Sequence, residues 1–127
     1  MTTPRFRVAG TVLATRDAQA LAAFYERLLG WPRRASEPGW VVLRPDGRSH
    51  GLSFHEDAAY VPPVWPSRVG EQQIMIHLDI ATDDLDAAIG EAVAAGATVA
   101  EHQPQPGVWV MLDPDGHPFC LFESDLD

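Results

Sequence analysis

The apolar residues of this chain follow a helical spacing in two segments. In each segment they fall at positions i, i+3, i+4, i+7 and i+8, which places them on one face of a helix. Asp17 and Asp83 precede the segments as N-caps, and Gly30 and Gly96 follow them as C-caps. The apolar residues are Leu21, Phe24, Tyr25, Leu28 and Leu29 in the first helix and Leu85, Ala88, Ile89, Ala92 and Val93 in the second.

Short runs rich in β-favouring residues predict the strands. Residues 8–14 and 74–81 each precede a predicted helix, and three more short strands follow each helix. Residues 45–47 and 114–116 both read Pro-Asp-Gly, a turn sequence in which Pro presets φ and Gly accepts a positive φ. The later strands are predicted near 33–36, 40–44 and 50–56, and near 98–102, 108–113 and 118–123.

The chain repeats itself once. Residues 12–17 resemble residues 79–84 at an offset of 67, and residues 40–47 resemble residues 109–116 at an offset of 69. Two matches in the same order at nearly equal offsets indicate a tandem duplication. We therefore expect an α+β fold of two tandem βαβββ units, with curved mixed sheets around a cleft and the helices outside. The chain of 127 residues is predicted to be one domain, with unit one at 6–56, a linker at 57–73 and unit two at 74–124.

Composition and charge exclude several classes of function. The net charge is −9 and no cluster of Lys or Arg stands out along the sequence, which disfavours nucleic acid and anionic membranes as partners. The lone Cys120, the lack of a signal-like apolar start and the lack of a spanning apolar run predict a cytoplasmic protein. Phosphate-binding glycine loops, HExxH and CxxC are all absent from the sequence, and we expect no cofactor.

The repeat carries two stretches that resemble a known family. They are residues 77–85, His-Leu-Asp-Ile-Ala-Thr-Asp-Asp-Leu, and residues 113–123, Asp-Pro-Asp-Gly-His-Pro-Phe-Cys-Leu-Phe-Glu. Together with the βαβββ pattern, they resemble the vicinal oxygen chelate superfamily, which contains glyoxalases, bleomycin-resistance proteins and dioxygenases. The closest resemblance is to its small glyoxalase-like domain proteins.

That resemblance implies where a metal would bind. Enzymes of the superfamily hold a divalent metal with one ligand from the first strand and one from the last strand of each unit. These positions fall on His77 and Cys120 in unit two, and at offsets of 67 and 69 on Gly10 and Gly51 in unit one. Two positions then have no side chain and a third has a thiol in place of the usual carboxylate. We expect that the metal site has been lost.

The residues most suited to contact a ligand follow from strand alternation. His77 and Asp79 share one face of their strand, where they form either a general base with its orienting carboxylate, a polar ligand contact, or a structural pair. Cys120 and Phe122 share a face of the last strand, and Ser53 and His55 share a face in unit one. Flat apolar surfaces come from the tryptophans, with Trp65 of the linker predicted to close the cleft mouth. The predicted ligand-binding residues are His77, Asp79, Trp65, His55, Ser53, Cys120, Phe122 and Trp109, and the best catalytic candidate is His77.

Three functions remain open on this sequence. The first is a metal-independent protein that binds a small organic molecule, as sequestering or resistance proteins do. The second is a metal-dependent lyase, isomerase or dioxygenase of the same superfamily. The third is a dimerisation or regulatory module with a vestigial cleft. Because members of the superfamily commonly dimerise, a homodimer is expected.

Overall fold

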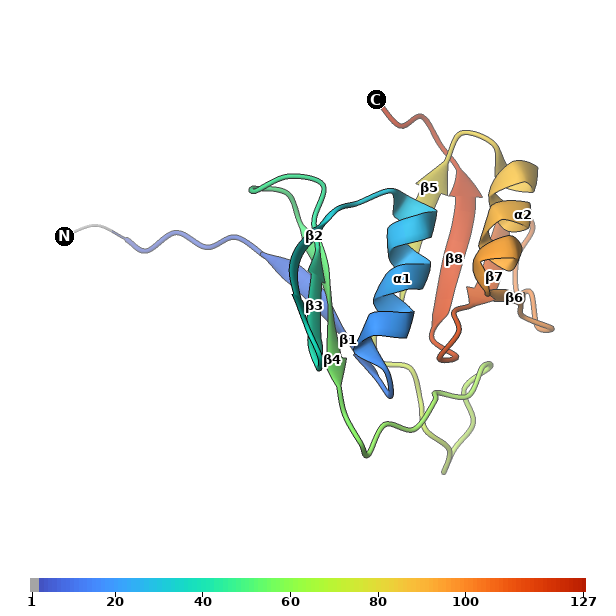
Figure 1. Cartoon of the computed structure of the whole chain (residues 1–127). Coiled ribbons are helices and arrows are strands. Elements are labelled where there is room, and N and C mark those ends of the chain that lie inside the picture. The colour runs from blue at the N-terminus through green and yellow to red at the C-terminus, as the bar shows by residue number, and fades with distance from the viewer. Residues whose placement is uncertain (1–2) are drawn as a thin grey trace. The chain divides into compact units, whose positions relative to one another are not determined.

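A computed structural model describes residues 3–127 and confirms the α+β fold. The chain divides into two compact units, Met1–Ala58 and Ala59–Asp127. Each unit has one helix and one four-stranded mixed sheet (Figure 1). Neither sheet closes into a barrel, since each has two edge strands.

Unit one contains the first βαβββ motif. Its sheet has the order β1-β4-β3-β2, with β1 parallel to β4 and the other pairs antiparallel. Helix α1 packs against β3 and β4. The elements are β1 (Gly10–Thr15), α1 (Ala18–Leu29), β2 (Arg33–Glu37), β3 (Trp40–Leu43) and β4 (Gly51–Glu56).

Unit two repeats this arrangement. Its sheet has the order β5-β8-β7-β6, again with the parallel pair at the start of the order. Helix α2 packs against β8 and β6. The elements are β5 (Leu78–Thr82), α2 (Leu85–Ala95), β6 (Thr98–Val99), β7 (Val108–Leu112) and β8 (Pro118–Glu123).

Both helices begin with the same set of hydrogen bonds. The Asp17 carboxylate accepts from the backbone N–H of Ala20, as an N-cap does. In unit two the N-cap is Asp84, so the prediction of Asp83 was wrong by one residue. The carboxylate of Glu56 also accepts from the first helical N–H, and Glu123 does the same in unit two. The predicted C-caps Gly30 and Gly96 are confirmed, both with positive φ.

The hydrophobic core of unit one lies between α1 and its sheet. Tyr25 is fully buried, stacks on Phe54 with ring centroids 5.6 Å apart and meets Phe24 edge-on at 4.8 Å. The face of the unit-one sheet that carries Phe54 therefore faces the helix. The predicted stripe on α2 packs less completely, since Ala92 alone among its five residues is buried and Val93 is 48% exposed.

Most of the linker, from Ala59 on, belongs with unit two. The Tyr60 hydroxyl donates to the backbone oxygen of Asp115, and the Val64 N–H donates to the oxygen of Gln72. The segment predicted at 57–73 thus packs on itself and on the β7–β8 turn. Within residues 3–127, no helix has the length and apolar character needed to cross a membrane.

Candidate functional site

The strongest cluster of chemically active side chains lies on the sheet of unit two. We call the sheet face opposite the helix of each unit its far face. In unit two Phe119 and Leu121 are buried on the helix side, so Cys120 lies on the far face. Asp79 is the register partner of Cys120 on the neighbouring parallel strand, and His77, two residues before Asp79, shares its face. Adjacent strands therefore bring the three residues together.

The three residues form one polar group, which we call the His77–Asp79–Cys120 cluster. Nε2 of His77 lies 3.1 Å from Oδ1 of Asp79. Because a carboxylate accepts hydrogen bonds, the Nε2–H donates and leaves Nδ1 as an acceptor. The side chains of His77 and Asp79 are 44% and 64% exposed, which leaves both open to a ligand. One donor atom from each of the three residues lies within 4.8 Å of the other two.

The thiol of Cys120 is held in its protonated form. Burial raises the pKa of Cys120, and the negative charge of Asp79 and a hydrogen bond to that carboxylate raise it further. A thiolate is the nucleophilic form of cysteine, so Cys120 is a poor nucleophile at neutral pH. Asp79 stands between the thiol and His77, which is the wrong order for a Cys-His nucleophile pair. The cluster is suited to hydrogen bonding and to proton acceptance at His77.

This arrangement gives a first prediction on thiol reactivity. In Asp79→Asn the pKa of Cys120 falls, because the negative charge that raises it in addition to burial is removed. The thiolate fraction at pH 8 then increases, and alkylation by iodoacetamide should become about threefold faster or more. Mass spectrometry of timed samples measures the rate. Asp86→Asn, an exposed helix residue, is the matched control, and equal rates in both variants would contradict the assignment.

The strand registers correct one equivalence between the two units. Gly10 pairs with Gly51 in unit one, and Leu78 pairs with Phe119 in unit two, so both parallel pairs follow an offset of 67. Cys120 therefore corresponds to Ser53, and the predicted match of Cys120 with Gly51 was wrong. By the same registers Trp40 corresponds to Val108, because their partners His55 and Phe122 are equivalent, so the offset of 69 taken from the turns is one residue too large for β3 and β7.

The three cluster residues and their equivalents in unit one do not fit the metal centre of the superfamily. In unit one the positions that match the cluster hold Gly10, Val12 and Ser53, and none has a nitrogen or carboxylate ligand. Mg²⁺ and Mn²⁺ prefer about six ligands, mostly oxygens, and unit two supplies a single carboxylate. Zn²⁺ is bound by nitrogen, oxygen and sulfur, and catalytic zinc sites use three protein ligands. Asp79 adds a third donor that the sequence prediction did not count, so zinc is the metal that this set fits best.

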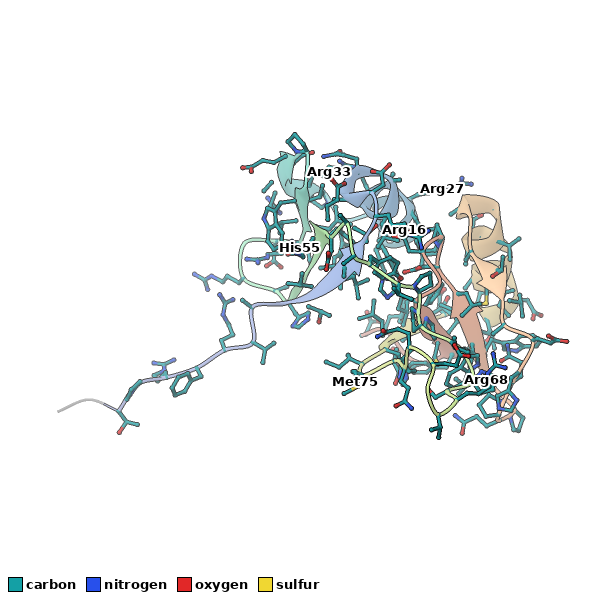
Figure 2. All side chains as sticks on the ribbon, turned by 90° about the horizontal axis from the view of Figure 1, so that it is seen from below. Arg16, Arg27, Arg33, His55, Arg68 and Met75 are labelled. Atoms are coloured by element: carbon teal, nitrogen blue, oxygen red, sulfur yellow. The ribbon has the colours of Figure 1, made fainter. Side chains whose placement is uncertain are left out.

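The other predicted site residues fall on two different faces. Ser53 and His55 lie on the far face of the unit-one sheet, since Phe54 between them faces the helix. Figure 2 labels His55 on this sheet. Trp40 pairs with His55 and shares the far face, a position that was not among the predicted site residues. Side chains alternate between the two faces along a strand, so the pairing of Trp40 with His55 is the signal that places Trp40 on the far face.

Trp109 does not join the cluster. It pairs with Leu121, so its side chain shares the helix side of the sheet. Trp109 was predicted to bind the ligand, and its register separates it from the face that carries Cys120. Phe122 does lie on the face of Cys120 by alternation and is half-buried there. An apolar ring thus lies on the same face as the polar cluster.

Trp65 is fixed by neighbours within unit two. Its indole Nε1–H donates to the backbone oxygen of His102 at 3.1 Å, and the two rings are tilted with centroids 6.0 Å apart. The side chain is half-buried rather than free at a loop tip. Part of its role is therefore structural, and its predicted place at a cleft mouth stays a prediction.

Comparison with known proteins agrees with this architecture. A model of the Glyoxalase-like domain family matches residues 10–122. No curated protein matches the sequence. Among solved structures, a glyoxalase/bleomycin resistance protein/dioxygenase family enzyme from Burkholderia phytofirmans PsJN superposes with a TM-score of 0.68 at 23% identity, covering 91% of this chain and 97% of that one.

Two further solved structures share the fold. A glyoxalase-related enzyme from Fulvimarina pelagi has a TM-score of 0.66 at 20% identity and covers 93% of this chain and 88% of its own. TnmS3, an antibiotic binding protein from Streptomyces sp. CB03234, has a TM-score of 0.64 at 20% identity and covers 98% of this chain and 100% of its own. The family match spans nearly all of both βαβββ units. This chain belongs to the Glyoxalase-like domain family.

Proposed function

We propose that this protein binds a small organic molecule through the His77–Asp79–Cys120 cluster, without a metal ion. The observation that supports this most directly is the convergence of three different hydrogen-bonding groups within 4.8 Å on one sheet face. Small-molecule sites combine a few convergent polar groups with apolar surroundings. Phe122 is the apolar neighbour on the same face.

The cluster favours a ligand that donates hydrogen bonds. The Asp79 carboxylate accepts from Nε2 of His77 and from the Cys120 thiol, and its remaining lone pairs can accept from a ligand. Across residues 3–127, no Lys or Arg lies within 4.0 Å of Asp79 to neutralise it. A ligand with an amine, amide or hydroxyl group complements this site. Trp65, which belongs to the same unit, remains in the proposal as a candidate ligand contact, and Ser53 and His55 remain candidates for a ligand contact on unit one.

The biological role that fits this site is sequestration or resistance. One solved structure of the same fold is described as an antibiotic binding protein. A binding protein of this kind needs neither a nucleophile nor a cofactor, which agrees with the protonated thiol of Cys120. We propose further that the protein is a cytoplasmic homodimer.

The second candidate is an enzyme that uses zinc. The three donor atoms of the cluster are the observation that favours it. His77, Asp79 and Cys120 would hold the ion, which supplies Lewis-acid chemistry when bound. Loading would require the Cys120 thiol to lose its proton against a raised pKa.

Elemental analysis separates the two candidates. We expect protein purified without chelator and dialysed against metal-free buffer to contain far less than one zinc per chain. His77→Ala should then leave the zinc content unchanged. One equivalent of zinc that survives dialysis, and that is lost together in His77→Ala and Cys120→Ser, would support the enzyme instead.

Native mass spectrometry of the same preparation tests binding itself. A mass above that of the 127-residue chain, lost on denaturation, would reveal a ligand that co-purifies. A panel of small organic compounds, antibiotics included, follows by thermal shift, because a ligand that binds only the folded state raises the melting temperature. If no compound shifts the melting temperature and none co-purifies, the binding proposal fails.

A further inference from the structure

The cations of this chain are concentrated in one of its two units. Counting side chains, unit one has eight arginines and six carboxylates, a formal charge of +2. Unit two has one arginine and twelve carboxylates, a formal charge of −11. Figure 2 labels Arg16, Arg27 and Arg33 on unit one and Arg68 on unit two. The net charge of −9 conceals this asymmetry.

Four of the unit-one arginines gather at the loop between β3 and β4, residues 44–50. Arg34 of β2 donates to the backbone oxygen of Arg44 at 3.4 Å and to that of Pro45 at 3.2 Å. Arg7, from the segment before β1, donates to the backbone oxygen of Arg48. The sequence separates these residues widely, which is why no basic cluster is visible along the chain. We call Arg7, Arg34, Arg44 and Arg48 the arginine cluster.

Against its four positive charges, the arginine cluster has one carboxylate in its loop, Asp46, whose pKa is lowered by hydrogen bonds from the loop backbone and in part by the charge of Arg34. The side chains of Arg7 and Arg34 donate to neutral backbone oxygens, and within residues 3–127 no member of the cluster forms an ion pair. The one carboxylate in the loop, Asp46, is turned onto the loop backbone. It accepts from the N–H groups of Arg48 and Ser49 at 2.7 Å, and these hydrogen bonds lower its pKa.

Arg44 is the member with an unsatisfied donor. Its Nε atom is buried and has no hydrogen-bond partner. The side chain lies across Gly51, since a Cβ placed on Gly51 would be 3.0 Å from this Nε. Gly51 pairs with Gly10, and it lies on the far face two residues before Ser53. The guanidinium group of Arg44 thus lies against Gly51 on the far face of unit one.

A buried donor without a partner is unfavourable, and such groups are uncommon in native proteins. Arg44 as a whole is half-buried, so part of its side chain is exposed to solvent although Nε is covered. Rotation about its side-chain torsions can turn the Nε–Nη edge toward an incoming anion. That edge matches two oxygens of a carboxylate or a phosphate, and the hydrogen bonds formed are charge-assisted.

We propose that the arginine cluster is an anion-binding site on unit one, separate from the His77–Asp79–Cys120 cluster. Arg44 makes the direct hydrogen bonds to a ligand oxyanion, either a carboxylate or a phosphate group. Arg34 and Arg48 raise the local positive potential. Gly51 provides a floor without a side chain, on which the guanidinium lies.

Titration of the full chain with inorganic phosphate tests the site. A parallel titration with sodium acetate tests carboxylate binding, and both are done at constant ionic strength. The Arg Nε–Hε signals are followed by NMR. We expect a saturable shift of the Arg44 signal. The anion that binds with the higher affinity identifies the ligand class. Arg44→Gln should weaken binding about fivefold or more, because a charge-assisted donor is lost. Arg68→Gln removes one arginine from unit two and should change the affinity less than twofold.

Stability provides an independent measurement. Arg44→Gln removes a donor that has no partner, so its melting temperature should equal or exceed that of the wild type. If this variant fails to fold, Arg34→Gln replaces it and should weaken phosphate binding about twofold or more through lost potential. The proposal is overturned if neither anion gives a saturable Arg44 shift on the order of tens of millimolar. Equal weakening by Arg34→Gln and Arg68→Gln would also overturn it, since that is general charge screening.

Discussion

Replacing Gly51 by Ala is expected to lower the free energy of unfolding by about 2–4 kcal/mol. The added Cβ would lie 2.7 Å from the backbone oxygen of Leu43 and 3.0 Å from Nε of Arg44. The first of these contacts is with the neighbouring strand β3, whose backbone is fixed by its own hydrogen bonds. The strands must separate locally to relieve the overlap, and the sheet loses part of its pairing.

Urea unfolding followed by circular dichroism measures this loss, with two matched glycine variants. Gly90→Ala lies in α2, where nothing is within 4 Å of the new Cβ, and should raise stability by about 0.5–1 kcal/mol. Gly39→Ala meets one side-chain carbon at 3.7 Å, an ordinary contact, and should change stability little. If Gly51→Ala is as stable as Gly39→Ala, the close approach of β3 and β4 at this point is wrong.

The same geometry explains why a lost ligand position is hard to restore in unit one. The Cβ of any residue at Gly10 would lie 2.9 Å from the backbone oxygen of Gly51. A histidine introduced at Gly10 to match His77 must therefore displace the parallel partner strand. Gly10 and Gly51 therefore allow the strands to approach closely, in addition to leaving two ligand positions without a side chain.

The fold was predictable from the sequence because each local signal agreed with the repeat. Asp17 and Gly30 bound the first helix as predicted, and β8 has the bounds expected from its apolar run. The N-cap of α2 was misassigned because Asp83 and Asp84 are adjacent and chemically identical. The offset of 67 distinguishes them, since Asp17 then corresponds to Asp84.

The site was predictable only in part. Alternation from a buried residue placed His77, Asp79 and Cys120 on one face, and the structure brings them together. Trp109 was misplaced because the Pro-Asp-Gly turns suggested an alignment with Trp40. The strand registers pair Trp40 with His55 and Trp109 with Leu121, which puts them on opposite faces relative to their helices. A one-residue slip in a strand exchanges its two faces.

The arginine cluster could not be found from spacing. Its members come from the segment before β1, from β2 and from the loop between β3 and β4. Sheet order places β2 beside β3, and this brings Arg34 to the oxygens of Arg44 and Pro45. Charge counted by unit, rather than over the whole chain, is the sequence signal that indicates it.

Replacing Asp79 by Asn is expected to weaken small-molecule binding about 10–30-fold, the largest effect of any single change in the cluster. Asp79 contacts both His77 and Cys120, so its replacement changes the hydrogen bonds of both side chains at the same time. Its carboxylate also attracts a hydrogen-bond donor on the ligand, at a net strength of about 1.5–2 kcal/mol. Exposure of 64% keeps the effect at the low end of the range for charged hydrogen bonds.

Isothermal titration with the compound found by native mass spectrometry or by the thermal-shift panel measures this change. Asp86→Asn removes the same charge from the first turn of α2 and should leave the affinity within about twofold, because exposed charges at a distance are screened by salt. His77→Ala should weaken binding by a smaller factor, since it removes one acceptor and leaves the carboxylate. If Asp79→Asn and Asp86→Asn weaken binding equally, the ligand responds only to the net charge of unit two. If neither weakens it, the ligand binds elsewhere on the chain, and the cluster is a structural hydrogen-bonded group.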